Sequence, residues 1–175
     1  MTEYRLTTEQ LRSFCPKLNC GDKIYLSGAV YTSRDAAHKR IFELLDCGKE
    51  PPYPLCDAVI YYAGPTPTPD GLAIGSCGPT TSSRMDPYTP KLHDIGVVAT
   101  IGKGERSPEV IDSIKRNNAV YLCAIGGAGA IAAMHITDCE VIAFDDLGCE
   151  SVKRLTFKDF PLIVGIDSNG NSIFK

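Results

Sequence analysis

Residues 78–85 read Gly-Pro-Thr-Thr-Ser-Ser-Arg-Met and are the most informative part of this chain. Two threonines, two serines and an arginine behind a Gly-Pro turn do not suit a hydrophobic core. They suit a loop running into a helix that begins near Thr81, where free backbone N–H groups, hydroxyls and a guanidinium converge on an anion. Arg84, one turn along, can present a bidentate fork. From these residues alone, a serine- and threonine-rich cap beside an exposed arginine is an equally good interpretation.

Two further turn-rich segments carry a cation: Thr-Ser-Arg-Asp-Ala-Ala-His at 32–38 and Ile-Gly-Lys-Gly-Glu at 101–105. Arg34 in the first turn of a helix sits at the positive end of the helix dipole, which is unfavourable unless an anion is near. A salt bridge to Asp35 or another acid is the alternative. Lys103 lies between two glycines, which let the backbone turn tightly and a ligand approach; an exposed loop lysine is the alternative. Together, the three cations predict a site for a small, multiply charged acid.

Strand-like and helix-like patterns alternate along the chain. We expect strands at 24–31, 58–63, 97–101, 119–125, 141–144, 155–157, 162–166 and 172–174. We expect helices at 34–47, capped by Ser33, at 89–95, from 107 onward, and up to 134 after Gly126-Gly127. This alternation predicts an α/β fold with a mixed, largely parallel sheet. Residues 1–20 are expected to be a lead segment with a brief helix ending at Leu11, and residues 21–175 a single domain.

Composition narrows the class of protein. The net charge of −3 gives no reason to expect nucleic-acid binding, and no apolar run is long enough to cross a membrane. The N-terminus lacks an apolar signal core, which makes secretion an unfavoured interpretation. None of the eight cysteines forms a Cys-x-x-Cys pair, so neither a zinc site nor a ferredoxin-type cluster is indicated. Eight reduced thiols in a cytoplasmic protein are the plainest reading.

Several short segments, in their order and spacing, resemble one family. They are Ser-Arg-Asp-Ala-Ala-His (33–38), Tyr-Tyr-Ala-Gly-Pro (61–65), Gly-Pro-Thr-Thr-Ser-Ser-Arg-Met-Asp (78–86), Ile-Gly-Lys-Gly (101–104), Tyr-Leu-Cys-Ala-Ile-Gly-Gly-Ala (121–128) and Asp-Phe-Pro (159–161). The chain resembles the β subunit, or C-terminal domain, of iron–sulfur hydro-lyases such as class I fumarase and L-tartrate dehydratase. The resemblance runs from about Gly21 to about Gly170. It implies a swivelling β/β/α domain that closes over a partner carrying the metal cluster.

The resemblance also implies an activity: reversible hydration of a small dicarboxylate, with fumarate to (S)-malate favoured and L-tartrate to oxaloacetate next. The 4Fe-4S cluster would belong to an α subunit, so this chain would hold no metal ligand and would work in an αβ hetero-oligomer.

The implied substrate-binding residues are Arg34, Thr80, Thr81, Arg84 and Lys103. Thr80 would move the C3 proton and Lys103 would stabilise charge. Asp35 and His38 are candidates for residues that support the substrate-binding ones, but Asp35 also fits an acid at a helix N-terminus, and His38 equally fits a surface or packed helix histidine. A threonine hydroxyl is a poor base at neutral pH and would need strong local cations. A non-catalytic module that binds small acids or phosphate, and a purely structural subunit, are the alternative functions.

Overall fold

The computed structural model describes residues 1–125 and 127–174. Its strands are β1 (Glu3–Thr7), β2 (Lys23–Thr32), β3 (Val59–Tyr61), β4 (Ala99–Gly102), β5 (Val120–Cys123), β6 (Ile136–Ala143) and β7 (Val152–Ile166). Its α-helices are α1 (Leu11–Phe14), α2 (Asp35–Asp46), α3 (Thr89–Ile95), α4 (Pro108–Asn117) and α5 (Gly129–Met134). Short 3₁₀ helices are η1 (Thr8–Gln10), η2 (Cys15–Lys17), η3 (Ser82–Met85) and η4 (Asp145–Glu150).

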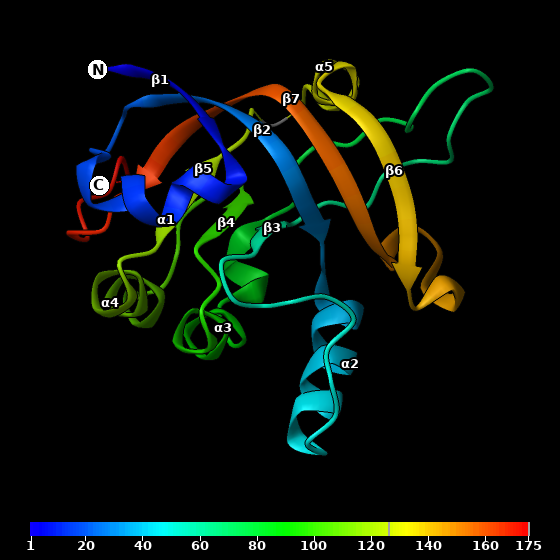
Figure 1. The fold of residues 1–175 in the computed structure, drawn as a ribbon, viewed down its shortest axis with the longest axis horizontal. Coiled ribbons are helices and arrows are strands. Elements are labelled where there is room, and N and C mark those ends of the chain that lie inside the picture. The colour runs from blue at the N-terminus through cyan, green and yellow to red at the C-terminus, as the bar shows by residue number, and fades with distance from the viewer. Residues whose placement is uncertain (126, 175) are drawn as a thin grey trace.

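The described strands form one mixed sheet in the order β1-β2-β3-β4-β5-β7-β6. Strands β1 to β5 pair in parallel, whereas β7 runs antiparallel to β2, β5 and β6. Because β7 pairs with both β2 and β5, the strands β2, β3, β4, β5 and β7 close into a ring. Figure 1 shows β2 and β7 side by side over the top of the molecule, with α2, α3 and α4 together below them. The α/β class and the mixed sheet are confirmed.

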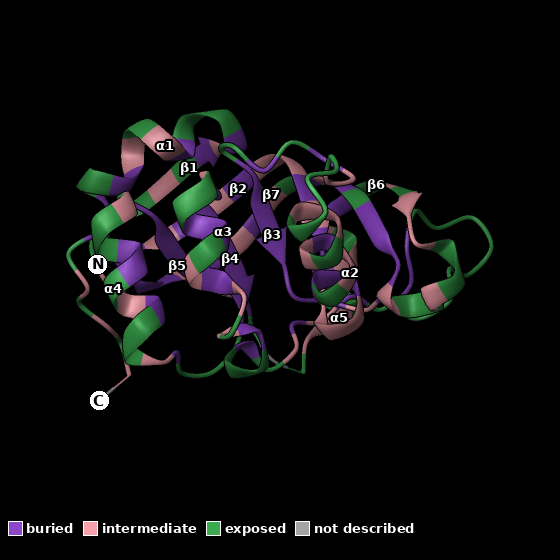
Figure 2. Cartoon of the chain, turned by 90° about the horizontal axis from the view of Figure 1, so that it is seen from below, coloured by how far each residue is buried: buried purple, intermediate pink, exposed green. Residues whose placement is uncertain are grey.

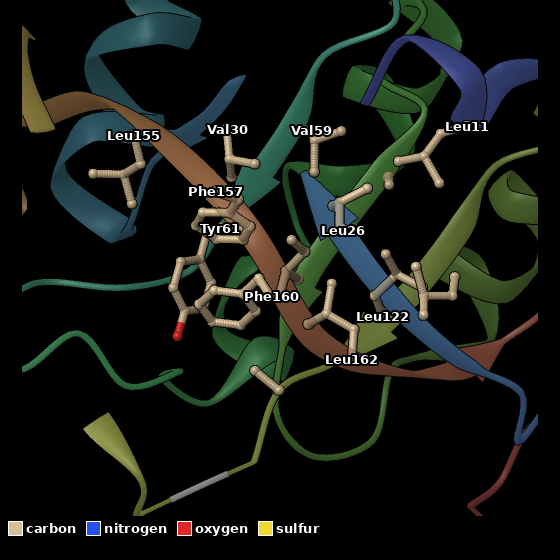
Figure 3. Packing of buried hydrophobic residues seen from close by; sticks show 14 of the residues in the cluster. Leu11, Leu26, Val30, Val59, Tyr61, Leu122, Leu155, Phe157, Phe160 and Leu162 are labelled. Carbon is tan, nitrogen blue, oxygen red and sulfur yellow. The ribbon is translucent and has the colours of Figure 1, made fainter. Parts of the chain in front are cut away.

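The main core fills the inside of this ring. Alternate residues of each strand point inward because successive side chains of a strand face opposite sides of the sheet. Figure 3 shows Leu26, Val30, Tyr61, Phe157 and Phe160 converging from β2, β3 and β7. Fully burying one such side chain stabilises the fold by ~1.5–3 kcal/mol.

The helices cover the outer face of the parallel strands. Ile41 of α2 and Leu92 of α3 pack with Ile60 and Tyr62, while Ile114 of α4 belongs to a separate apolar cluster. Figure 2 shows buried residues on the inner sides of these helices and exposed residues on their outer sides. This layer anchors the segments that leave the carboxyl ends of the strands.

The C-terminal third differs from the strand prediction. The separate strands expected at 155–157 and 162–166 are one strand, β7. The strand expected at 141–144 overlaps the end of the longer β6, which stops at Ala143. Asp159 and Pro161, whose residue types are rare in strands, lie between the two expected segments. Tertiary pairing accommodates them: Asp159 takes a positive φ of 48°, and its N–H donates to Ser27 Oγ (2.9 Å) beside the irregular pairing near Gly28.

Both ends of the chain also differ in detail. The N-terminal residues, expected as a lead segment with a brief helix, contribute the unpredicted strand β1, and Leu6 and Leu11 are buried. At the other end, the strand expected at 172–174 is only an isolated bridge between Ile166 and Ser172. Gly126, which we expected in the turn before α5, lies outside the described residues.

Helix α2 begins one residue later than predicted. Arg34, not Ser33, occupies the N-cap position, in extended conformation. Ser33 is buried, and its Oγ lies 2.9 Å from His38 Nδ1 instead of capping the helix.

Candidate functional site

The predicted site residues gather at the carboxyl ends of the parallel strands. In a parallel sheet these ends share one edge, where α/β proteins commonly bind ligands. Arg34 follows β2, and Lys103 follows β4. The Thr80 segment reaches the same edge because the N–H and Oγ1 of Thr80 both donate to the carbonyl of Tyr62, just after β3, each at 2.8 Å.

Thr81 and Lys103 form an isolated parallel bridge. The Ser82 N–H donates to the Lys103 carbonyl (3.0 Å), and the Lys103 N–H donates to the Thr80 carbonyl (3.3 Å). Gly102 permits this approach, because a side chain there would collide with Ser82. The bridge places the motif at 78–86 beside the lysine, although the two are distant in sequence.

The motif does not form the anion-binding helix N-terminus that we expected. η3 is a single 3₁₀ turn of four residues with Thr81 at its N-cap. The N–H groups of Thr80 and Ser82 are already bonded to Tyr62 and Lys103. These two backbone donors therefore fix the loop and do not point at a ligand.

The side chains of the motif differ in accessibility. Thr81 and Arg84 are exposed, whereas Thr80 is half-buried and Ser82 is fully buried, with its Oγ accepting from Tyr121 OH at 2.9 Å. Lys103 is exposed beside Gly104, whose φ of 83° suits glycine. A solute can therefore contact the side chains of Thr81, Arg84 and Lys103, whereas Thr80 at the same edge is less accessible.

Each arginine of the site faces one carboxylate. Arg84 Nε donates to Asp35 Oδ1 (3.2 Å), which joins η3 to the first residue of α2. Arg34 Nε lies 3.3 Å from Glu150 Oε1. The acid partner considered for Arg34 is therefore Glu150 and not Asp35. Among residues 1–125 and 127–174, the terminal nitrogens of both arginines have no hydrogen-bond partner.

His38 supports the start of α2 from the interior. Its Nδ1 lies 2.9 Å from both the Ser33 hydroxyl and the Arg34 carbonyl, and its ring packs between Tyr62 and Tyr88. Burial lowers the pKa of His38 to about 4, so the ring is neutral at neutral pH. It cannot reach a solute directly because it is fully buried.

Sequence reasoning missed the buried Arg106. Its Nε donates to Asp86 Oδ1 (2.7 Å), and its terminal nitrogens donate to the hydroxyls of Thr100, Tyr62 and Thr89. Asp86 is the last residue of the motif at 78–86, and Arg106 lies three residues after Lys103. The sequence signal for this pair was therefore an acidic and a basic residue, each next to a predicted site segment. Nothing in their spacing indicated that the pair is buried.

The cysteines are dispersed. All eight fall in the described part of the chain and are free, and no group of three His, Cys, Asp or Glu side chains among the described residues could hold a metal ion. Burial raises the pKa of the Cys77 thiol to about 12, as expected for an unreactive core residue. No helix within the described residues has the length and apolarity needed to cross a bilayer.

Comparison with known proteins identifies the family. The model of the family described as "Fumarase C-terminus" matches residues 1–175. The chain belongs to this family. The matched region thus includes the carboxyl ends of β2, β3 and β4 and the loop that contains Thr80 and Arg84.

Its relatives differ in length. The chain is 39% identical over 155 residues to the anaerobic class I fumarate hydratase of Escherichia coli K12, covering 87% of this chain and 28% of that protein. It is 38% identical over 169 residues to fumarate hydratase 2 of Leishmania major, with 95% and 30% covered. It is 38% identical over 165 residues to a putative L(+)-tartrate dehydratase subunit β of Methanocaldococcus jannaschii, with 91% and 85% covered. The chain therefore spans under a third of these fumarate hydratases but most of the β subunit.

Proposed function

We propose that this chain is the β-type part of an iron–sulfur hydro-lyase that reversibly adds water across the double bond of a small dicarboxylate. Fumarate to (S)-malate is the favoured reaction, and L-tartrate to oxaloacetate is the second candidate. Family membership supports the reaction class, because the relatives carry the names fumarate hydratase and tartrate dehydratase. We also propose that the protein works in the cytoplasm, in keeping with its eight free thiols.

The bridge between Thr81 and Lys103 carries this proposal. It brings a lysine and the Thr80–Arg84 segment together at the edge where Arg34 also emerges. A dicarboxylate needs cations at both ends, and arginine forks match the planar geometry of carboxylates. Arg34 and Arg84 would each offer their terminal nitrogens to a carboxylate, while Thr81 would donate from its hydroxyl.

Charge stabilisation would come from the same cations. Loss of the C3 proton places negative charge on the adjacent carboxylate, and fixed cations lower the energy of that charge without reorganisation. Lys103 sits on a loop fixed by the Ser82 N–H and is exposed to a solute. It would therefore stabilise the developing charge, and the two arginines would fix the orientation of the substrate.

Thr80 is the proposed group for moving the C3 proton. Its hydroxyl donates to the Tyr62 carbonyl, so this proton must first pass to solvent before Oγ1 can accept the C3 proton. The cations of Arg84 and Lys103 would favour the resulting alkoxide. A role as a hydrogen-bond donor alone would require the hydroxyl to leave Tyr62.

The described residues do not fit a 4Fe-4S cluster, because no three potential metal ligands gather among them. We therefore assign the cluster to an α-type partner and derive no step through it. The long relatives hold this domain within a larger chain, whereas the tartrate dehydratase relative is a named subunit. That difference in length supports the proposal of an αβ complex, and the swivelling of this domain against its partner is proposed from the family resemblance alone.

An exposed apolar patch is available for this partner. The patch comprises Ile125, Ile131 and Met134, which are 63%, 58% and 82% exposed. It adjoins the site through the start of α5. The carbonyl of Gly129 accepts from the N–H of Cys77 (3.1 Å), and Cys77 precedes Thr80 by three residues. A partner covering the patch would therefore also reach the substrate edge.

Anaerobic purification of the protein from its native cells tests the proposal. We expect a co-purifying chain that contains iron, with oxygen-sensitive hydration of fumarate or dehydration of tartrate. Arg84→Ala should abolish most of this activity. A lone, iron-free and inactive chain that binds small acids or phosphate would instead support the non-catalytic module.

A further inference from the structure

Each arginine of the site forms an ion pair through its Nε edge, but only the contact of Arg84 is also a hydrogen bond, since the buried Arg34 Nε has no hydrogen-bond partner among the described residues. Each turns its Nε edge toward one carboxylate of the protein: Arg84 toward Asp35 (3.2 Å) and Arg34 toward Glu150 (3.3 Å). Within the described residues, the terminal nitrogens of both have no hydrogen-bond partner. Asp35 neighbours Arg34 in sequence and was expected at the site, whereas Glu150 lies on a distant segment that the proposed function leaves unused.

Glu150 is carried by a well-anchored connection. It is the last residue of η4, between β6 and β7. The ammonium of the buried Lys153 donates to the carbonyls of Gly148 and Cys149, each at 3.2 Å, and the Ser151 hydroxyl donates to the Gly148 carbonyl at 2.7 Å. A single buried lysine therefore fixes the turn from which the Glu150 side chain extends.

The Arg34 guanidinium is confined on a second side. Gly64 lies so close to Nη1 that a side chain at that position would meet it, and the Cys149 carbonyl borders the same space. The side chains of Arg34 and Glu150 are only 21% and 26% exposed. Partial burial shields the ion pair from solvent screening and makes its geometry more restrictive than that of a surface pair.

We infer that Glu150 is a positioning residue: it fixes the guanidinium of Arg34 so that the terminal nitrogens face the substrate carboxylate. This inference rests on the proposed function. Arginine carries several rotatable bonds, and immobilising such a side chain on binding opposes association. A carboxylate that fixes the guanidinium in advance removes much of that cost, because it engages only the Nε edge.

The substitution Glu150→Gln in the intact complex tests this role. Because Arg34 would bind the carboxylate equally in the ground and transition states, we expect KM to rise ~10-fold while kcat stays within ~3-fold. The matched control is Asp146→Asn. It removes the same charge from η4 and breaks an ion pair with α2, the exposed contact of Asp146 with Arg40. We expect its KM to match that of the unsubstituted protein.

The direction in which KM changes in Glu150→Gln distinguishes a positioning role from a simple electrostatic effect of removing one negative charge. Glu150 adds a negative charge near a site for a dianion, so charge removal alone would strengthen substrate binding and lower KM. A fall in KM, or no change, in Glu150→Gln would overturn the inference. The unfolding temperature of each variant is measured alongside, since a purely structural role would lower it without a selective rise in KM.

A third variant, Arg34→Met, separates this inference from the proposed function. If Arg34→Met lowers kcat/KM strongly but Glu150→Gln behaves like Asp146→Asn, only the role of Glu150 fails. If Arg34→Met leaves kcat/KM unchanged, both the substrate clamp and its positioning residue are wrong. Should Glu150→Gln fail to fold, Glu150→Asp keeps the charge but shortens its reach, and a KM equal to that of the unsubstituted protein would count against positioning.

Discussion

Arg106 and Asp86 form an ion pair of 2.7 Å in which the arginine side chain is fully excluded from solvent. The second carboxylate oxygen of Asp86 accepts from the N–H of Ser107 at the start of α4 (2.7 Å). Asp86 ends the motif that carries Arg84, and Arg106 ends the loop that carries Lys103. The pair therefore joins, below the surface, the two segments whose cations are exposed above it.

Breaking this pair should destabilise the protein strongly. Removing one partner of a buried, hydrogen-bonded ion pair typically costs ~3–5 kcal/mol, because the other charge is left buried and unpaired. We expect Arg106→Met to lower the free energy of unfolding by about that amount. Denaturant unfolding measures the change. The control is Arg116→Met, which breaks the exposed pair with Asp94 and should cost only ~0–1 kcal/mol. Equal losses in both variants would contradict a structural role for the buried pair.

Arg84 should matter for activity far more than for stability. Its side chain is 58% exposed, and its pair with Asp35 is a surface contact. If Arg84 binds a substrate carboxylate, Arg84→Ala in the active complex should lower kcat/KM by a factor equivalent to ~2–4 kcal/mol. Lys91→Ala, which removes an equally exposed cation paired with Asp46, is the control. A kcat/KM for Arg84→Ala within ~3-fold of the unsubstituted protein would remove Arg84 from the site.

Two buried histidines should make the fold sensitive to acid. Burial lowers the pKa of His38 to about 4 and that of His93 to about 3. Both values lie below the unfolded value of about 6.5, so the unfolded chain binds more protons as the pH falls from about 6.5 toward 4. The stabilising contribution of each histidine is therefore fully present above about pH 6.5 and is lost as the pH falls through that range, by up to ~1.4 kcal/mol per pH unit.

Denaturant unfolding at about pH 7, 6 and 5 measures this slope. His93 is the better residue to replace, because it lies in α3 with its Nδ1 beside Ser113 Oγ (2.8 Å) and away from the candidate site. His93→Gln removes one titrating group and should reduce the slope. An unchanged slope in this variant would assign the acid sensitivity to other groups.

The apolar patch should decide partner binding. A charge at Ile131 or Met134 would be buried without a counter-charge if the α-type partner covers them. We expect Ile131→Glu to prevent co-purification of the partner while the chain itself stays folded. The matched control is Leu72→Glu, since Leu72 is 62% exposed and Ile131 is 58% exposed, yet Leu72 lies on a separate loop. Retention of the partner by Ile131→Glu would place the interface on another face.

Local pattern determined much of the fold. The strands ending near Arg34, before Tyr62 and at Lys103 were predicted closely, because short apolar runs flanked by turn residues identify parallel strands. Helix α4 also begins after Ser107, as Ser107-Pro108 indicated, whereas α3 begins one residue before the start that Thr89-Pro90 indicated, with Tyr88 at its N-cap. The same alternation determined that these strands share an orientation, and so that their carboxyl ends meet.

Only the tertiary structure decided which side chains work together at that edge. Glu150 approaches Arg34 because β7 returns antiparallel to β2, and a pairing across so many residues leaves no periodic mark in the sequence. The burial of Arg106 with Asp86 depends in the same way on two loops packed against α3 and α4. The sequence therefore identified the cations of the site, because their residue types indicate their chemistry. Long-range pairing determined the carboxylate partners of the two arginines, because the energy of an ion pair depends on distance and burial, which the chain acquires only on folding.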